Sequence, residues 1–243
     1  MPWRETLYEG PATVQISVVD AALVLQIAQE DTGPCLDLVP FLSDILSDPS
    51  ILKTGVGIDQ DMMELMKWPA ENHSNGSVLW QDMVGRLDLG GIGGRPGTTQ
   101  SLKTLGEIFC GVDLVKDKRL ARSNWARAPR ISMRQIAYAA RDAWVASAVL
   151  EELARRDPRQ FSTPALVERV LKEEISIHVL LERAAARKVT KGKLQSLLGV
   201  GDDRIDRKSL PKDQLEVLLD LEQEFRELAP PRPLVFDLGP LGL

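Results

Sequence analysis

Two side chains that can act together on a water molecule or a metal ion stand four residues apart in the segment Y-A-A-R-D. They are the phenol of Tyr138 and the carboxylate of Asp142. If this segment is helical, the spacing places both on one face, with Cβ atoms about 5–6 Å apart. A surface tyrosine beside a solvated aspartate is the ordinary interpretation of such a pair taken alone, so the surrounding sequence has to decide.

A third candidate is Asp61, which follows the apolar run I-L-K-T-G-V-G-I. This run predicts a short buried strand, and residues 59–66 predict a helix directly after it. Asp61 then lies in the first turn of that helix, close to the carboxyl edge of a sheet, where open α/β proteins bind their ligands. The alternative is that Asp59 and Asp61 only interact with the dipole of the helix.

The chain around these residues predicts an α/β domain. Residues 12–27 indicate two adjacent strands, and residues 36–46 indicate a helix that precedes the strand at 51–58. The order is therefore strand, strand, helix, strand and helix, which is typical of a sheet with helices on its faces.

Two further helices are expected from the signals at their ends. Ser132 and Gln135 form an S-x-x-Q capping box, which predicts a long helix that reaches about Arg155 and carries the tyrosine–aspartate pair. Thr99 can cap a shorter helix that stops at Gly111.

The strand signals end at Pro158. Two long amphipathic helices are predicted at about 164–187 and 211–228, followed by a proline-punctuated tail. We therefore predict an α/β domain at residues 1–157 and a helical C-terminal region at 158–243. The apolar stripes of these helices have to be covered, either by the first domain or by a protein partner.

The composition narrows the class of protein. The 243 residues are 44% hydrophobic and 27% charged with a net charge of −5, which excludes a disordered chain and a uniformly basic nucleic-acid binder. Cys35 and Cys110 are too few for a disulfide framework, and we expect both to be buried small apolar groups. With no apolar run of 18 residues, we expect no membrane association and an intracellular location, in the nucleus or the cytoplasm.

One local segment is strongly basic. Residues 116–141 hold eight lysines and arginines against a single acid, Asp117. The candidates for contacts to phosphate groups and, through the indole ring, to a base are Lys118, Arg119, Arg122, Trp125, Arg127 and Arg130. The alternative is a solvated basic loop whose tryptophan packs in the core.

Several motifs together resemble a known family. V-G-I-x-x-D, S-L-K-T-L, K-D-K-R-L-A-R-S-N-W and P-R-I-S-x-x-Q-I-A-Y-A-A-R-D-A occur in this order across most of residues 3–155. They are similar to the motifs of the 3′–5′ exonuclease domain shared by ribonuclease D and the Werner-syndrome exonuclease. The resemblance implies a ribonuclease-H-like mixed β-sheet flanked by helices, here with a helical C-terminal extension.

The resemblance also implies a chemistry. Members of this family remove nucleotides from a single-stranded 3′ end with two divalent ions, Mg²⁺ or Mn²⁺, and hydrolyse phosphodiester bonds. Asp61 matches the acid of the second family motif and Asp142 that of the third, so both are expected to hold metal. Tyr138 matches the tyrosine that orients the attacking water. Asp88 falls where relatives often have a further acid, and we interpret it as structural.

The chain departs from the family at its first motif. Relatives begin with a strand that carries D-x-E before a tryptophan and often an arginine, whereas Trp3-Arg4 here follow Met1-Pro2. Two acids that hold the metal pair are therefore missing, and we expect this chain to be impaired in catalysis. Either the sequence is a fragment of an active exonuclease, or it is an inactive adaptor of the same fold that binds nucleic acid or protein partners.

Overall fold

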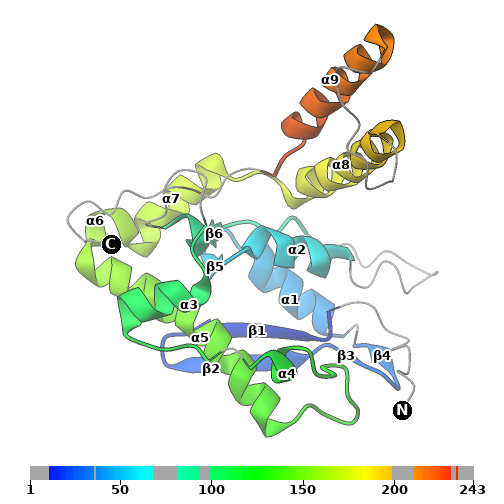
Figure 1. Ribbon diagram of the computed structural model, residues 1–243. Helices are drawn as coiled ribbons and strands as arrows, with labels where there is room; N and C mark the ends of the chain where they lie inside the picture. The colour runs from blue at the N-terminus through cyan, green and yellow to red at the C-terminus, as the bar shows by residue number, and fades with distance from the viewer. Residues whose placement is uncertain are drawn as a thin grey trace. The chain divides into compact units, whose positions relative to one another are not determined.

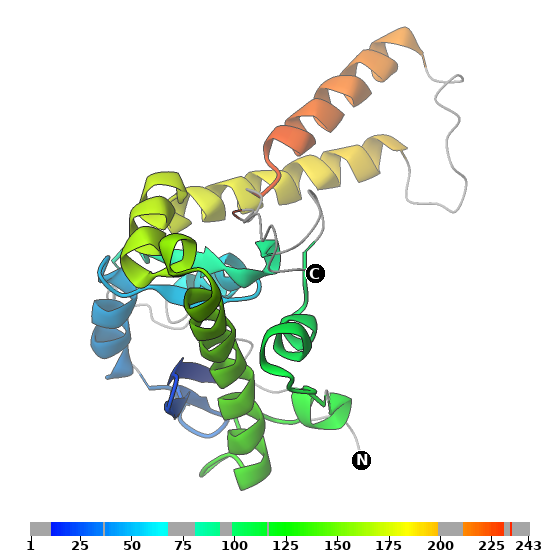
Figure 2. The same cartoon turned by 90° about the vertical axis from the view of Figure 1, so that its left-hand side faces the viewer.

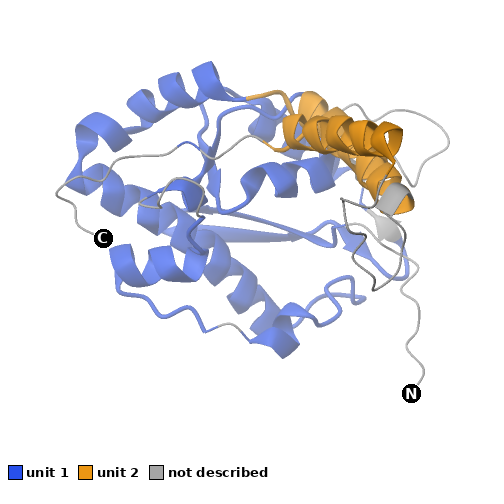
Figure 3. Cartoon of the chain, turned by 45° about the horizontal axis from the view of Figure 1, so that its top comes forward, with its two compact units in different colours: residues 1–174, 232–243 blue, residues 175–231 orange. Residues whose placement is uncertain are grey.

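The computed structural model describes seven parts of the chain (Figure 1): residues 11–35, 37–67, 81–92, 99–115, 117–198, 211–230 and 234. The first-motif residues 1–4 and the glycine-rich stretch 93–98 lie outside the described residues. The chain divides into two compact units, which Figure 3 shows in different colours. Unit 1 comprises residues 1–174 and 232–243, and unit 2 comprises residues 175–231.

Unit 1 contains an antiparallel ribbon of two strands. Strands β1 (Thr13–Val18) and β2 (Ala21–Gln26) pair along their whole length, so that Thr13 lies opposite Gln26 and Val18 opposite Ala21. This confirms the prediction of two adjacent strands within residues 12–27. A two-residue turn connects them, as is common in hairpins.

The other strands of unit 1 are short. Strands β5 (Lys53–Gly55) and β6 (Arg86–Asp88) form a parallel pair, and β3 (Ala28–Gln29) pairs with β4 (Gly33–Pro34) in antiparallel fashion. Both directions of pairing are present, as expected for a mixed α/β architecture. The described residues form three two-stranded sheets and not the single sheet that the sequence predicts, because none of the described strands pairs with both β1 and β5.

One long helix packs against both the β1–β2 pair and strand β5 of the β5–β6 pair. Helix α5 (Met133–Arg156) packs against β1, β2 and β5, as Figures 1 and 2 show. Its contact with β1 is partly polar, because the Ser17 hydroxyl donates to the Ala143 carbonyl at 2.8 Å and lies 2.7 Å from the Ser147 hydroxyl. The Trp144 indole donates to the Val19 carbonyl in the hairpin turn at 2.9 Å.

Unit 1 contains further helices besides α5. They are α1 (Leu38–Ser47), α2 (Ile58–Lys67), α3 (Leu102–Leu105), α4 (Lys118–Ala121), α6 (Pro158–Phe161) and α7 (Thr163–Glu173), with a 3₁₀ turn at Leu89–Gly91 and a π-helical turn at Gly106–Cys110. The expected cap at Thr99 is wrong, because the Ser101 hydroxyl accepts the Thr104 amide hydrogen at 3.1 Å. Gly111, with φ 65°, ends the helical segment as predicted.

The first predicted C-terminal helix is two helices. Its beginning is α7, whose Leu166 and Val170 are buried in the core of unit 1 with Leu105, Val145 and Val149. The helix ends at Glu174, where the backbone is extended with ψ 149°. The continuous helix expected at 164–187 is therefore wrong.

Unit 2 is a pair of helices, α8 (Ile177–Leu198) and α9 (Lys212–Glu227). The buried Thr190 hydroxyl donates to the Glu224 carboxylate at 2.8 Å, and the Arg187 guanidinium lies 4.2 Å from the centre of the Phe225 ring. Among the residues that the structure describes, no helix is long and apolar enough to span a bilayer.

Candidate active site

The N-terminal half of α5 carries the tyrosine–aspartate pair. The predicted capping box is present, because the Ser132 hydroxyl accepts from the Gln135 amide nitrogen at 3.3 Å and the Gln135 side chain accepts from the Ser132 amide at 2.9 Å. This cap fixes the first turn of α5, one turn before Tyr138. The phenol of Tyr138 and the carboxylate of Asp142 are neighbours across the next turn, near enough to interact.

The surroundings of Tyr138 keep its phenol protonated. Burial raises the pKa of Tyr138, and the negative charge of Asp142, the hydrogen bond to it and the charge of Asp117 raise it further. The phenol is therefore neutral at neutral pH and can donate its proton to a neighbouring oxygen atom. A group of this kind can orient a water molecule, which is the role that the sequence predicts.

Asp61 lies beside a second acid. It is in the first turn of α2, where its backbone amide donates to the Gly57 carbonyl at 3.3 Å. Asp88 stands at the end of β6, and burial followed by the charge of Asp88 raises the pKa of Asp61. Burial also raises the pKa of Asp88. The hydrogen bonds from two backbone amides lower this pKa, and the charge of Asp59 raises it.

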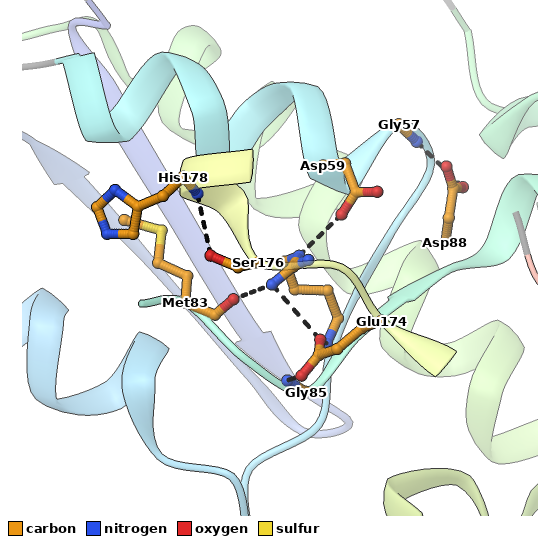
Figure 4. Close-up of polar contacts among 9 residues, drawn as sticks. Gly57, Asp59, Met83, Gly85, Asp88, Glu174, Ser176 and His178 are labelled. Atoms are coloured by element: carbon orange, nitrogen blue, oxygen red, sulfur yellow. Dashed lines mark hydrogen bonds and ion pairs between the residues drawn. The ribbon is translucent and has the colours of Figure 1, made fainter. Parts of the chain in front are cut away.

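Asp88 has a visible structural function. One oxygen of its carboxylate accepts a hydrogen bond from the backbone amide of Gly57, at 3.1 Å (Figure 4), and another from that of Gly90, at 2.8 Å. It therefore connects the end of β6 to the start of α2. These contacts agree with the interpretation of Asp88 as structural, and they place it next to Asp61.

A buried arginine beside this pair was not found from the sequence. The Arg86 side chain is 2% exposed, and its guanidinium contacts the Asp59 carboxylate at 2.8 Å, the Glu174 carboxylate at 3.4 Å and the Met83 carbonyl. Glu174 also accepts from the backbone amides of Gly85, at 3.0 Å, and Arg86, at 3.2 Å. The available signal was that positions 86 and 88 of a short strand carry opposite charges on one face.

The basic segment is fixed to the hairpin side of unit 1. The Gln26 side chain donates to the Arg127 carbonyl at 2.8 Å, the Gln29 side chain donates to the Pro129 carbonyl at 3.0 Å, and the Glu30 amide donates to the Ala126 carbonyl at 2.7 Å. Six cations of this segment have exposed side chains and form no ion pair within the described part of the chain: Lys118, Arg119, Arg122, Arg127, Arg130 and Arg141.

Trp125, within the basic segment, contacts Tyr138. The side chain is half-buried, its indole donates to the Ala121 carbonyl at 3.2 Å, and its ring centre is 6.2 Å from that of Tyr138 with the planes tilted by 52°. Such a tilted pair is a favourable aromatic contact. The tryptophan therefore connects α4 to the tyrosine on α5.

The structure thus brings the candidate residues together as two pairs, Asp61 with Asp88 and Tyr138 with Asp142. No three of the acidic, histidine or cysteine side chains that the structure describes lie together closely enough to hold a metal ion.

The two cysteines differ in burial. Cys110 is half-buried, and burial raises its pKa, whereas Cys35 is exposed, so the expectation that Cys35 is buried is wrong.

Comparison with known proteins identifies the family. The model of a family described as 3′–5′ exonuclease matches residues 11–156, more than half of the chain, and this range contains both pairs and the basic segment. The chain therefore belongs to the 3′–5′ exonuclease family, as its motifs indicated. No curated protein and no solved structure matches it.

The contact between Tyr138 and Asp142 predicts a shift in the titration of the phenol. The chain has two tyrosines, so Tyr8→Phe leaves Tyr138 as the single one. In this background we expect Tyr138 to titrate above the free value of about 10, and Asp142→Asn to lower its pKa because the neighbouring negative charge is removed. Absorbance at 295 nm measures both titrations; equal pKa values would contradict the contact.

The buried contacts of Glu174 predict a large effect on stability. Glu174→Ala leaves the Arg86 guanidinium with one carboxylate and should lower the free energy of unfolding by about 3–5 kcal/mol. Glu173→Ala is the matched control, since its pair with Arg169 is exposed and should contribute less than about 1 kcal/mol. Urea denaturation measures both variants, and losses of similar size would contradict the prediction.

Proposed function

We propose that the chain acts as a nuclease that hydrolyses phosphodiester bonds from the 3′ end of a nucleic acid and depends on divalent metal ions. The observation that carries the proposal is the Tyr138–Asp142 pair on α5, in the same segment as exposed arginines that form no ion pair with the described residues, within the range that matches the family. The first part of the proposal, a nuclease-like protein, follows from the family. The activity of this chain is the part that needs an experiment.

The carboxylate of Asp61 is a hard oxygen ligand that fits a Mg²⁺ or Mn²⁺ ion. Mg²⁺ in proteins is commonly held by one or two carboxylates together with waters and substrate phosphates. Burial and, after it, the negative charge of Asp88 raise the pKa of Asp61, and a bound cation would favour the charged carboxylate. The ion would activate water as a nucleophile and neutralise charge on the phosphate.

The residues of the chain would divide the remaining work. Asp61 would hold the ion, with Asp88 keeping the turn before α2 in place. Asp142 would provide a further carboxylate to hold a metal ion. The protonated phenol of Tyr138 would direct the attacking water by a hydrogen bond. This assignment keeps the roles expected from the sequence for Asp61, Tyr138 and Asp142.

The basic segment would hold the polynucleotide. Unpaired arginines favour phosphate contacts because the guanidinium binds phosphate oxygens in a bidentate manner. The face of Trp125, next to Tyr138, is suited to stacking on a base near the 3′ end. We therefore propose that Lys118, Arg119, Arg122, Arg127 and Arg130 bind the backbone of a single-stranded nucleic acid.

A digestion assay tests the catalytic part. We expect the full chain, in excess over a single-stranded oligonucleotide labelled at its 5′ end, to shorten it slowly from the 3′ end when Mg²⁺ or Mn²⁺ is present. Asp142→Asn and Tyr138→Phe should each lower the rate at least tenfold, because a positioned proton acceptor or donor contributes about 10²–10⁴-fold to catalysis. Cleavage that neither change affects would refute the site, and binding without cleavage would favour the adaptor.

A binding assay tests the basic segment. The triple change Arg122→Ala, Arg127→Ala and Arg130→Ala should weaken binding and reduce the slope of log K against log salt concentration by about 2, since each phosphate contact to a single strand contributes about 0.7. Fluorescence anisotropy with a labelled oligonucleotide measures the slope.

The matched control for this triple removes three exposed lysines of α8, Lys188, Lys191 and Lys193. It lowers the net charge by the same amount and should leave the slope near that of the wild type. If the lysine triple reduces the slope and the arginine triple does not, the nucleic acid binds elsewhere on the chain.

A further inference from the structure

We infer that Arg86 is a positioning residue, which together with Asp88 clamps the first turn of α2 and so fixes the place of Asp61. The role of Asp61 in holding a metal ion rests on the proposed function, whereas the clamp itself rests on contacts between β6 and α2. Figure 4 shows these contacts around the unlabelled arginine.

The clamp has two points, both on one face of β6. Side chains two residues apart in a strand point to the same side, so Arg86 and Asp88 face the start of α2 together. The Arg86 guanidinium contacts the Asp59 carboxylate at 2.8 Å, and the Asp88 carboxylate accepts from the Gly57 amide at 3.1 Å. One point therefore holds a side chain of the first turn and the other holds the backbone just before it.

Asp61 is connected to both points through the backbone. The carbonyl of Gly57, whose amide is bound to Asp88, accepts from the amides of Gln60, at 3.0 Å, and Asp61, at 3.3 Å. Asp59, the other point, is two residues before Asp61. If the first turn of α2 shifted, Asp61 would shift with it, because the turn is one hydrogen-bonded unit.

The arginine is held from the opposite side. Glu174 binds its guanidinium and also the amides of Gly85 and Arg86, so that the strand and the side chain are fixed by the same carboxylate. Gly85 has φ 72°, and a Cβ atom there would lie 2.8 Å from the Ile51 carbonyl oxygen, so the backbone before Arg86 allows no other residue without strain. The planar guanidinium contacts three acceptors at once, the Asp59 and Glu174 carboxylates and the Met83 carbonyl.

The test removes the α2 point of the clamp and leaves the arginine paired. In Asp59→Ala, Arg86 keeps the more buried Glu174 and the Met83 carbonyl, and Glu174 keeps its two backbone amides, so the fold should remain with a smaller loss of stability than in Glu174→Ala. We expect the amides of Gln60 and Asp61 to exchange hydrogen at least tenfold faster, as measured by NMR, while core amides such as that of Val149 are unchanged. Mn²⁺ affinity, measured by electron paramagnetic resonance, should fall at least threefold.

Two further variants distinguish the effect of breaking the clamp from the general effect of removing an acid from the first turn of a helix. Asp213→Ala removes a first-turn acid from α9 and should change neither the exchange at Asp61 nor the Mn²⁺ affinity. Asp59→Glu keeps a carboxylate for Arg86 and should restore slow exchange. Unchanged exchange in Asp59→Ala, or equally fast exchange in Asp59→Glu, would overturn the clamp.

The clamp and the proposed function can fail separately. If Asp61→Asn binds Mn²⁺ as tightly as the wild type, Asp61 does not hold the ion and that part of the proposed function fails, while the exchange rates still decide on the clamp. If Asp61→Asn abolishes binding but Asp59→Ala retains both the affinity and slow exchange, the proposed function stands and the clamp is wrong.

Discussion

The ionic contacts of one buried guanidinium organise the part of unit 1 that carries the candidate acids. A charge with 2% of its side chain exposed is tolerated only where it is paired and hydrogen-bonded, and Arg86 has carboxylates on two sides. These carboxylates belong to α2 and to the end of α7, which are far apart in the chain. The need to pair this charge therefore brings two helices to the same strand.

The second constraint is that helix α5 packs against both the β1–β2 pair and strand β5. It packs on β1, β2 and β5, and its N-terminal half carries Tyr138 and Asp142. The serine contact with β1 and the indole hydrogen bond to the hairpin turn fix its position along the antiparallel ribbon. The tyrosine–aspartate pair is thus part of a rigid element, in keeping with a site that must orient a small molecule such as water.

Some local features of this protein were predictable from sequence, although the cap at Thr99 was not, and the ion pairs over long separations could not be predicted. The capping box at Ser132 and the stop at Gly111 depend on residues three or four apart, so their chemistry can be read directly. The pairing of Arg86 with Glu174 joins residues 88 apart, and nothing in either segment identifies its partner. The order of the strands is also beyond local patterns, because strand neighbours are set by long-range pairing, and the described residues form three separate two-stranded sheets.

The attachment of the basic segment to the hairpin has a thermodynamic consequence. Gln26, Gln29 and Glu30 already hold the backbone of residues 126–129 by hydrogen bonds, so a ligand that docks there meets a chain whose conformational entropy has been lost during folding. Association then orders mainly arginine side chains and the ligand itself. Its heat-capacity change should accordingly be small, in contrast to that of a loop that folds as it binds.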